Sequence, residues 1–178
     1  MATALKALGA VCAAAASAAT LAGAAPALAF SPPEGDFTAD FASPPQVAAQ
    51  GPRSRDDAGH RSYQLSDGAR LFEVTVDAYP ASIPTPPPDA QSCLLLLNAH
   101  ARQTGWRLVK TEKAEVAAGT VAVQGRLEAD DGRVELMRVV MAGRDIYQVR
   151  AVAQSGDDLG SAVAFVGSFT VRPTLARR

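Results

Sequence analysis

Cys93 and His100 are the two residues whose types come closest to a nucleophile and its general base. Both lie in the stretch from Asp89 to Gly105, which predicts a helix. In a helix, seven residues separate the two side chains by roughly 10.5 Å along the axis, which is too far for the hydrogen bond that activates a nucleophile. We therefore expect Cys93 to be a buried thiol and His100 to lie at the edge of the core.

A metal site would have to combine His60 with Asp56 and Asp57, because one imidazole and two carboxylates make a plausible ligand set. Adjacent aspartates point in different directions, however, and the loop around them is rich in glycine. Asp130 and Asp131 also form an acidic pair, but the Asp-Gly turn at this position explains them. The sequence therefore predicts no bound metal and no cofactor.

Sequence motifs of the common enzyme classes are absent. The chain lacks Gly-x-Ser-x-Gly, His-Glu-x-x-His, a phosphate-binding loop and Gly-x-Gly-x-x-Gly. Its two histidines leave few side chains that act as general bases near neutral pH. We therefore predict that the protein is not an enzyme and has no catalytic residues.

The large amphipathic side chains are the remaining candidates for a binding surface. Tyr79 precedes the proline-rich connector that enters the predicted helix, and Trp106 follows the end of that helix. Each has an apolar ring and a polar atom, which suits a ligand contact as well as a position at the rim of the core. We expect a shallow pocket near the helix ends, contacted by Tyr79 and Trp106.

Arg126 and Arg138 lie on neighbouring predicted strands, where they are expected to face solvent together. Two exposed guanidinium groups would suit an acidic partner. A cross-strand salt bridge with Glu128 or Glu135 is the alternative explanation for them. Both arginines are retained as candidate binding residues.

Residues 1–29 have the pattern of a secretory signal peptide. An alanine-rich apolar run, Leu8 to Leu21, follows a single lysine, and Ala27-Leu28-Ala29 is a cleavage site of the small-x-small type. Cleavage between Ala29 and Phe30 would release a chain exported to the periplasm or the extracellular space, with no stable membrane span. The apolar run is too short for a convincing span, although an uncleaved anchor stays an alternative.

Residues 30–178 have the size of a single domain. The whole chain has a formal charge of −1, and the loss of Lys6 with the signal peptide changes this charge to −2. A near-neutral domain has no basic field for nucleic acid, so we exclude a nucleic-acid partner. Cys93 would be the one cysteine left, which excludes an intramolecular disulfide.

One long helix at about residues 89–104 dominates the predicted secondary structure. The prolines at 86–88 fix its start, Asp89 supplies an N-cap, and Gly105 is a suitable C-terminal residue. A short C-terminal helix is predicted at about 157–166, and residues 173–178 are predicted to form a disordered tail.

The rest of the chain consists mainly of predicted strands and turns. Asp67-Gly68 and Asp131-Gly132 are strong hairpin signals, and Gly125 is expected to mark a β-bulge. Runs of strands without strictly alternating βα units predict an α+β fold with an antiparallel twisted sheet of about six to seven strands. Residues 47–59 are predicted to form a polar loop. The predicted strands are 37–41, 61–65, 69–78, 106–116, 120–129, 133–141 and 145–154.

Four segments resemble the PsbP-like domains of exported bacterial proteins. Phe37 to Pro45 (FTADFASPP) is similar to the opening strand of that family, and Ala69 to Pro80 (ARLFEVTVDAYP) to its second hairpin strand. Arg144 to Tyr147 resembles the start of the last strand, and Phe165 to Phe169 the close of the fold. The resemblance extends over nearly the whole chain after the signal peptide.

This resemblance implies the α/β/α sandwich of the photosystem extrinsic protein PsbP and of a Ran-binding nuclear import factor, here over residues 30–172. It implies no catalytic residue, because the shared motifs are short and apolar. The alanine-rich signal peptide is typical of bacteria, so a photosystem role is not implied. A shared fold alone is a weak basis for assigning a function.

The function predicted from these observations is that of an exported, non-catalytic domain. It would bind a protein or a component of the cell envelope. The alternative is a carrier of a small molecule or lipid, with a pocket between the long helix and the sheet.

Overall fold

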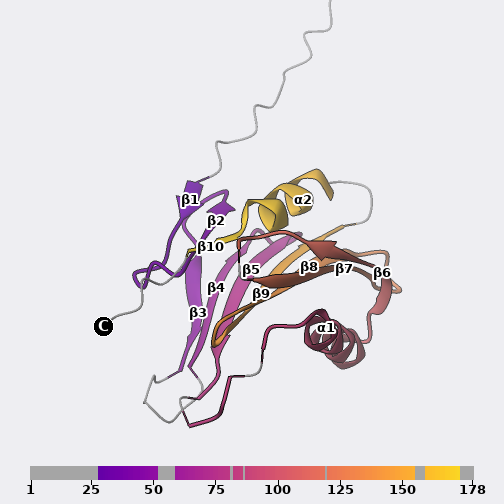
Figure 1. Cartoon of the computed structure of the whole chain (residues 1–178). Helices are drawn as coiled ribbons and strands as arrows, with labels where there is room; N and C mark the ends of the chain where they lie inside the picture. Colours follow the sequence, from indigo (N-terminus) through magenta and orange to yellow (C-terminus); the bar gives the residue numbers. More distant parts are fainter. Residues whose placement is uncertain are drawn as a thin grey trace, which may run out of the picture.

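The structure of the chain is a computed structural model that describes residues 28–51, 59–80, 82–85, 87–118, 120–154 and 159–172. These residues form ten strands in two antiparallel sheets and two helices. The two helices lie on opposite sides of the larger sheet (Figure 1). The α+β class predicted from the sequence is therefore confirmed.

The larger sheet has seven strands in the order β3-β4-β5-β9-β8-β7-β6. Two of its hairpins turn at the predicted Asp-Gly pairs, where Gly68 and Gly132 have φ angles of 87° and 86° that favour glycine. The strands are β3 (Gln46–Gln50), β4 (His60–Ser66), β5 (Leu71–Ala78), β6 (Arg107–Ala114), β7 (Val121–Glu128), β8 (Val134–Ala142) and β9 (Asp145–Ala153).

Helix α1 (Ala90–Thr104) covers the β6-β7-β8 part of one face. Asp89 caps it by accepting a hydrogen bond from the Ser92 backbone N–H at 2.8 Å, and Gly105 ends it with a φ of 73°. Its buried residues are Cys93, Leu97 and Ala101, and they pack on apolar side chains of β7 and β8. Leu95 is largely exposed, and Leu94 is only partly buried.

Helix α2 (Leu159–Ser168) covers the opposite face, above β8 and β9. Its buried residues Ala162, Phe165 and Val166 belong to the larger of the two apolar clusters. The helix continues two residues beyond the predicted end at residue 166, and residues 157 and 158 of the prediction lie outside the described part of the chain.

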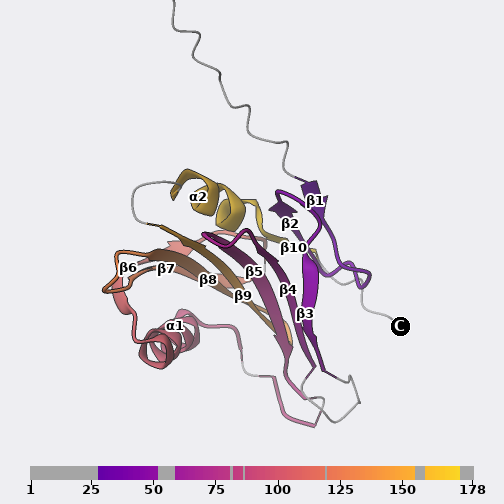
Figure 2. The same ribbon diagram turned by 180° about the vertical axis from the view of Figure 1, so that it is seen from behind.

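A smaller sheet of three strands lies on the α2 side (Figure 2). It consists of β1 (Leu28–Phe30), β2 (Phe37–Phe41) and β10 (Thr170–Val171), in the order β1-β2-β10. The sequence predicted residues 37–41 as one strand of a single sheet, but β2 is the middle strand of this second sheet. Its rings explain the difference, because Phe37 and Phe41 are both buried in the cluster beneath α2.

Two further predictions about the strands are wrong. Residues 47–50 were assigned to a polar loop, but they belong to the edge strand β3, which pairs with β4 through its backbone and leaves Val47 exposed. Gly125 does not mark a bulge; the register shift lies opposite, in β6, between Leu108 and Lys110. Gly125 is needed for packing instead, since a Cβ there would lie 2.9 Å from Cδ1 of Leu108. Residues 52–58 of the predicted loop lie outside the described part.

The predicted cleavage site lies within β1. Ala29 is opposite Asp40 and Phe30 is opposite Ala39, and the Phe30 ring lies 5.2 Å from the Tyr63 ring. Cleavage before Phe30 would therefore retain the aromatic contacts of that residue with the core. The rest of the predicted signal peptide and the C-terminal tail lie outside the described residues, and export stays a prediction. Among the helices described, neither is long and apolar enough to cross a membrane.

Candidate functional site

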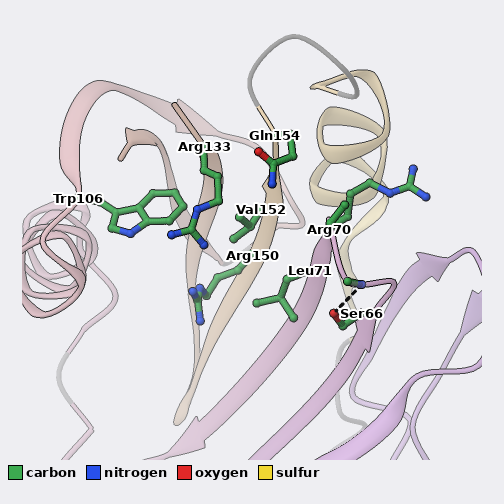
Figure 3. Close-up of a pocket in the computed structure, with 10 residues that line it drawn as sticks. Ser66, Arg70, Leu71, Trp106, Arg133, Arg150, Val152 and Gln154 are labelled. Carbon is green, nitrogen blue, oxygen red and sulfur yellow. Dashed lines mark hydrogen bonds between the residues drawn. The ribbon is translucent and has the colours of Figure 1, made fainter. Parts of the chain in front are cut away.

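A depression of about 230 Å³ lies at the end of the larger sheet, on the face that carries α1. Four chain segments meet there: the β4–β5 turn, the junction of α1 and β6, the β7–β8 turn and the end of β9 (Figure 3). Polar and apolar side chains both contribute. The lining residues are Ser66, Gly68, Ala69, Arg70, Leu71, Trp106, Arg133, Arg150, Val152 and Gln154.

The local structure fixes the positions of the largest side chains. Trp106 directly follows the left-handed Gly105, and its backbone N–H donates to the Ala101 carbonyl at 3.0 Å, so the chain reverses and brings the indole to the sheet end. Leu71 and Val152 are directly opposite each other on β5 and β9. Together they give the depression an apolar base beside the tryptophan (Figure 3).

Arg133 extends from the β7–β8 turn across the indole. Its guanidinium carbon lies 5.3 Å from the centre of the Trp106 ring, within the range of a cation–π contact. Its Nε donates to Oδ2 of Asp131 at 2.8 Å. The Arg133 backbone N–H also donates to Asp131, and these two bonds lower the pKa of that carboxyl. Asp131 therefore holds the Arg133 guanidinium over the indole through its Nε.

Arg150 comes from the middle of the sheet and connects the depression to a row of buried and partly buried polar groups. Its Nε donates to Oε1 of Glu135 at 2.6 Å, and its Nη1 donates to Oε2 of Glu73 at 2.8 Å. The other oxygen of Glu73 accepts a hydrogen bond from the Ser62 hydroxyl at 2.7 Å. Nε2 of His100, on α1, lies 3.1 Å from both oxygens of Glu135.

Glu135 is the central carboxylate of this row and is fully buried. Burial by itself raises the pKa of Glu135, but the hydrogen bond from His100 and the charge of Arg150 outweigh it and hold the pKa below its usual value. Glu135 is therefore ionised at neutral pH. Glu73 and Glu135 orient Arg150 at the rear of the depression, and His100 holds Glu135.

Hydrogen-bond donors and apolar surface line this site. Ser62 is bonded to a carboxylate and buried, so its hydroxyl has no imidazole partner. Cys93 lies buried in the α1 layer, and burial raises the pKa of its thiol, an effect to which nearby Asp89 adds. In the part of the chain that the structure describes, no three His, Cys, Asp or Glu residues are grouped as metal ligands are.

Of the four predicted binding residues, Trp106 alone lines the depression. Tyr79 follows the far end of β5, beside the start of α1, and packs at the edge of the α1 cluster. Its backbone carbonyl accepts a hydrogen bond from Nε of Arg144 at 3.3 Å. Tyr79 and Trp106 thus flank opposite ends of the helix and do not form one pocket.

Arg126 and Arg138 lie on the opposite face of the sheet, on the side of α2. Nη2 of Arg126 lies 3.1 Å from Oε1 of Glu128, which is two residues along the same strand. Nη2 of Arg138 donates to the Gln124 amide oxygen at 2.8 Å, and burial lowers the pKa of Arg138 while Glu112 opposes that shift. Arg126 therefore pairs with Glu128, one of the two carboxylates of the predicted alternative, but within its own strand and not across strands.

Arg133, Arg150 and Glu73 were not predicted as site residues, and Glu135 was paired with the wrong arginines. One feature of the sequence indicated that Glu135 has a buried partner. Glu135 stands in the apolar run from Val134 to Met141, where an acid at an inward position needs a buried partner. Residues 135 and 138 also differ by an odd number, so their side chains leave a strand on opposite faces.

No family model matches the chain, and no curated protein matches it. The resemblance to PsbP-like domains therefore stays a prediction.

Proposed function

We propose that the protein is an exported, non-catalytic binding domain that uses the depression at the end of α1 to hold a protein or a component of the cell envelope. The observation on which this proposal rests is the convergence of Trp106, Arg133 and Arg150. Their side chains come from three separate elements and point toward one another (Figure 3). Tryptophan and arginine are the side chains that most often dominate binding energy at protein interfaces.

The size of the depression favours part of a larger partner over a complete small ligand. Its volume is about 230 Å³, whereas sites for drug-sized molecules usually start at about 300 Å³. A volume of this order accommodates one side chain or one terminal group. The surrounding turns would then contact the rest of the partner.

The alternative of a small-molecule or lipid carrier has less support. Such a carrier needs space between α1 and the sheet, but Cys93 and Leu97 are fully buried in that layer. At Gly125 an added Cβ would already be 3.2 Å from Leu97 and 2.9 Å from Leu108. A ligand between helix and sheet would therefore have to displace closely packed side chains.

The PsbP-like fold, the bacterial origin and export remain part of the proposal. The placement of one helix on each face of an antiparallel sheet supports an α/β/α sandwich. The small-x-small sequence before Phe30 supports export to the periplasm or extracellular space. The near-neutral charge supports a partner other than nucleic acid.

Site-specific photo-cross-linking tests the binding role. A photoreactive amino acid at Gln154, an exposed position on the rim, should give a discrete adduct with an envelope component in the source cells. The matched control places the same group at Val163, which is exposed on α2 on the opposite face. The proposal requires an adduct from position 154 that disappears in a Trp106→Ala background and is absent from position 163. Equal adducts at both positions, or none at 154, would contradict it.

A further inference from the structure

We propose that the depression recognises a singly charged carboxylate that is attached to an apolar group, with Arg133 as its principal hydrogen-bond donor. This inference rests on the proposed binding function and specifies the chemistry that the site accepts. A chain-terminal carboxylate of a peptide and a free organic acid share that chemistry.

The terminal nitrogens of Arg133 are the donors that remain for a ligand. In the described part of the chain, the guanidinium of Arg133 donates through Nε to Asp131. The terminal nitrogens point into the space between Trp106 and Arg150 (Figure 3). A guanidinium that is fixed at Nε presents its remaining N–H groups in the fork geometry that matches the two oxygens of a carboxylate.

Arg150 adds a second donor at the rear of the depression. Its Nε donates to Glu135 and its Nη1 donates to Glu73. Its side chain is 22% exposed, so the group lines the hollow without lying free in solvent. Because two carboxylates hold Arg150, its position changes little when a ligand enters, which lowers the ordering cost of binding.

The apolar walls of the depression determine which group beside the carboxylate fits the site. The indole of Trp106 and the side chains of Leu71 and Val152 line the same hollow. Carbon atoms next to the carboxylate would contact these three residues and remove apolar surface from water. An aromatic or branched aliphatic group therefore suits the site better than a purely polar one.

The charges around the depression favour a monoanion over a phosphate dianion. Arg133 and Arg150 are both directed into the hollow, but Asp131, Glu73 and Glu135 are bonded to them. The C-terminal end of α1 also lies at this site and carries a partial negative charge. These two arginines and three carboxylates sum to a net charge of −1, so the local field repels a dianion more than a monoanion. Binding therefore depends on the directed hydrogen bonds and not on the local field.

Trp106 is the single tryptophan of the chain, so its fluorescence reports on this site alone. The probes are N-acetyl-L-phenylalanine, its uncharged C-terminal amide and phenyl phosphate, each titrated against the protein. We expect saturable quenching by the carboxylate with a Kd of about 1 mM. The amide and phenyl phosphate should each bind about tenfold more weakly, the amide because it lacks the charge-assisted pair.

Three variants identify the donor. Arg133→Met should weaken the carboxylate about tenfold, and Arg133→Lys should bind with intermediate strength because it keeps the charge but loses the fork. Arg126→Met, on the opposite face, should bind like the parent chain. Circular dichroism and the urea midpoint must show that each variant is folded. Equal binding of acid and amide, tighter binding of phenyl phosphate, or unchanged binding by folded Arg133→Met would overturn the inference.

The outcome separates this inference from the proposed function. If position 154 cross-links a partner but the titrations show no preference for a carboxylate, the ligand chemistry is wrong and the binding role stands. A carboxylate preference without a cross-linked partner supports the inference and contradicts the macromolecular partner. The absence of both results contradicts both proposals.

Discussion

Glu135→Gln should destabilise the fold far more than a typical substitution in a strand. The wild-type carboxylate is 0% exposed and bonds Arg150 at 2.6 Å and His100 at 3.1 Å. Glutamine has nearly the same volume, so the change creates no cavity. It removes the negative charge, however, and places an amide donor beside two groups that are themselves donors.

The magnitude follows from what the substitution leaves behind. Removing one partner of a buried ion pair costs about 3–5 kcal/mol when the other charge is left without compensation. Arg150 keeps its bond to Glu73 at 2.8 Å and retains some contact with solvent. We therefore expect a smaller loss, of about 2–3 kcal/mol, which corresponds to a decrease in Tm of about 4–12 °C for a domain of this size.

The difference in free energy of unfolding between the wild type and Glu135→Gln should depend on pH in a defined direction. Because the folded state holds the pKa of Glu135 below its usual value, the carboxylate stabilises the fold fully above the unfolded pKa of about 4.3. That stabilisation is lost as the pH falls through the lower pKa of the folded state. Protonated Glu135 and the glutamine that replaces it in the variant then carry the same charge, so the two free energies of unfolding should converge in acid.

Urea unfolding followed by far-UV circular dichroism at pH 7 and at several values below pH 4.3 tests this expectation. Glu115→Gln, at an exposed position, is the matched control and should change the free energy of unfolding by less than about 0.5 kcal/mol. A loss at pH 7 no larger than that of the control would refute the reasoning. So would a difference between wild type and Glu135→Gln that grows as the pH falls.

Three further predictions concern packing, reactivity and the connector. Gly125→Ala should lower the free energy of unfolding by about 1–3 kcal/mol, because the new Cβ would approach a leucine to 2.9 Å. Gly167→Ala, in α2, should raise that free energy by about 0.5–1 kcal/mol, because its Cβ would meet nothing within 4 Å. Urea titration distinguishes the two signs. Cys93 is buried, and burial raises the pKa of its thiol. In a variant without the other cysteine, Cys93 should therefore react with a disulfide reagent on the order of 100-fold more slowly in the folded protein than in guanidinium. Equal rates would show an accessible thiol. Arg144→Met removes a guanidinium that binds the Ile83 carbonyl at 2.9 Å and should speed hydrogen exchange at the Ile83 amide, with unchanged exchange in β9 as the control.

Local signals in the sequence predicted most of the main-sheet hairpins and the long helix. The Asp-Gly turns at Gly68 and Gly132 and the cap at Asp89 depend on nearest neighbours in the chain, so their residue types were sufficient. Strand β3 was missed because its residues, QVAAQ, neither alternate nor contain many β-branched side chains. Its position is decided by backbone pairing with β4, which no local pattern encodes.

The candidate site was predictable only in part, because its residues are brought together by the register of distant strands. The position of Trp106 after the helix indicated one wall. Its partner Arg133 depends on how the β7–β8 turn meets the end of α1, and Arg150 depends on the pairing of β9 with β5 and β8. Tyr79 was grouped with Trp106 because both adjoin the helix, yet a helix of 15 residues separates them by about 22 Å.

Nuclear magnetic resonance mapping of N-acetyl-L-phenylalanine on the protein tests the central claim most directly, because it observes each candidate surface at once. We expect the indole N–H of Trp106 and the side-chain Nε–H signals of Arg133 and Arg150 to shift with one common Kd. The corresponding signals of Arg126 and Arg138 should stay in place. Shifts confined to these two arginines on the α2 side, or no shift at Trp106, would contradict the assignment of the binding surface.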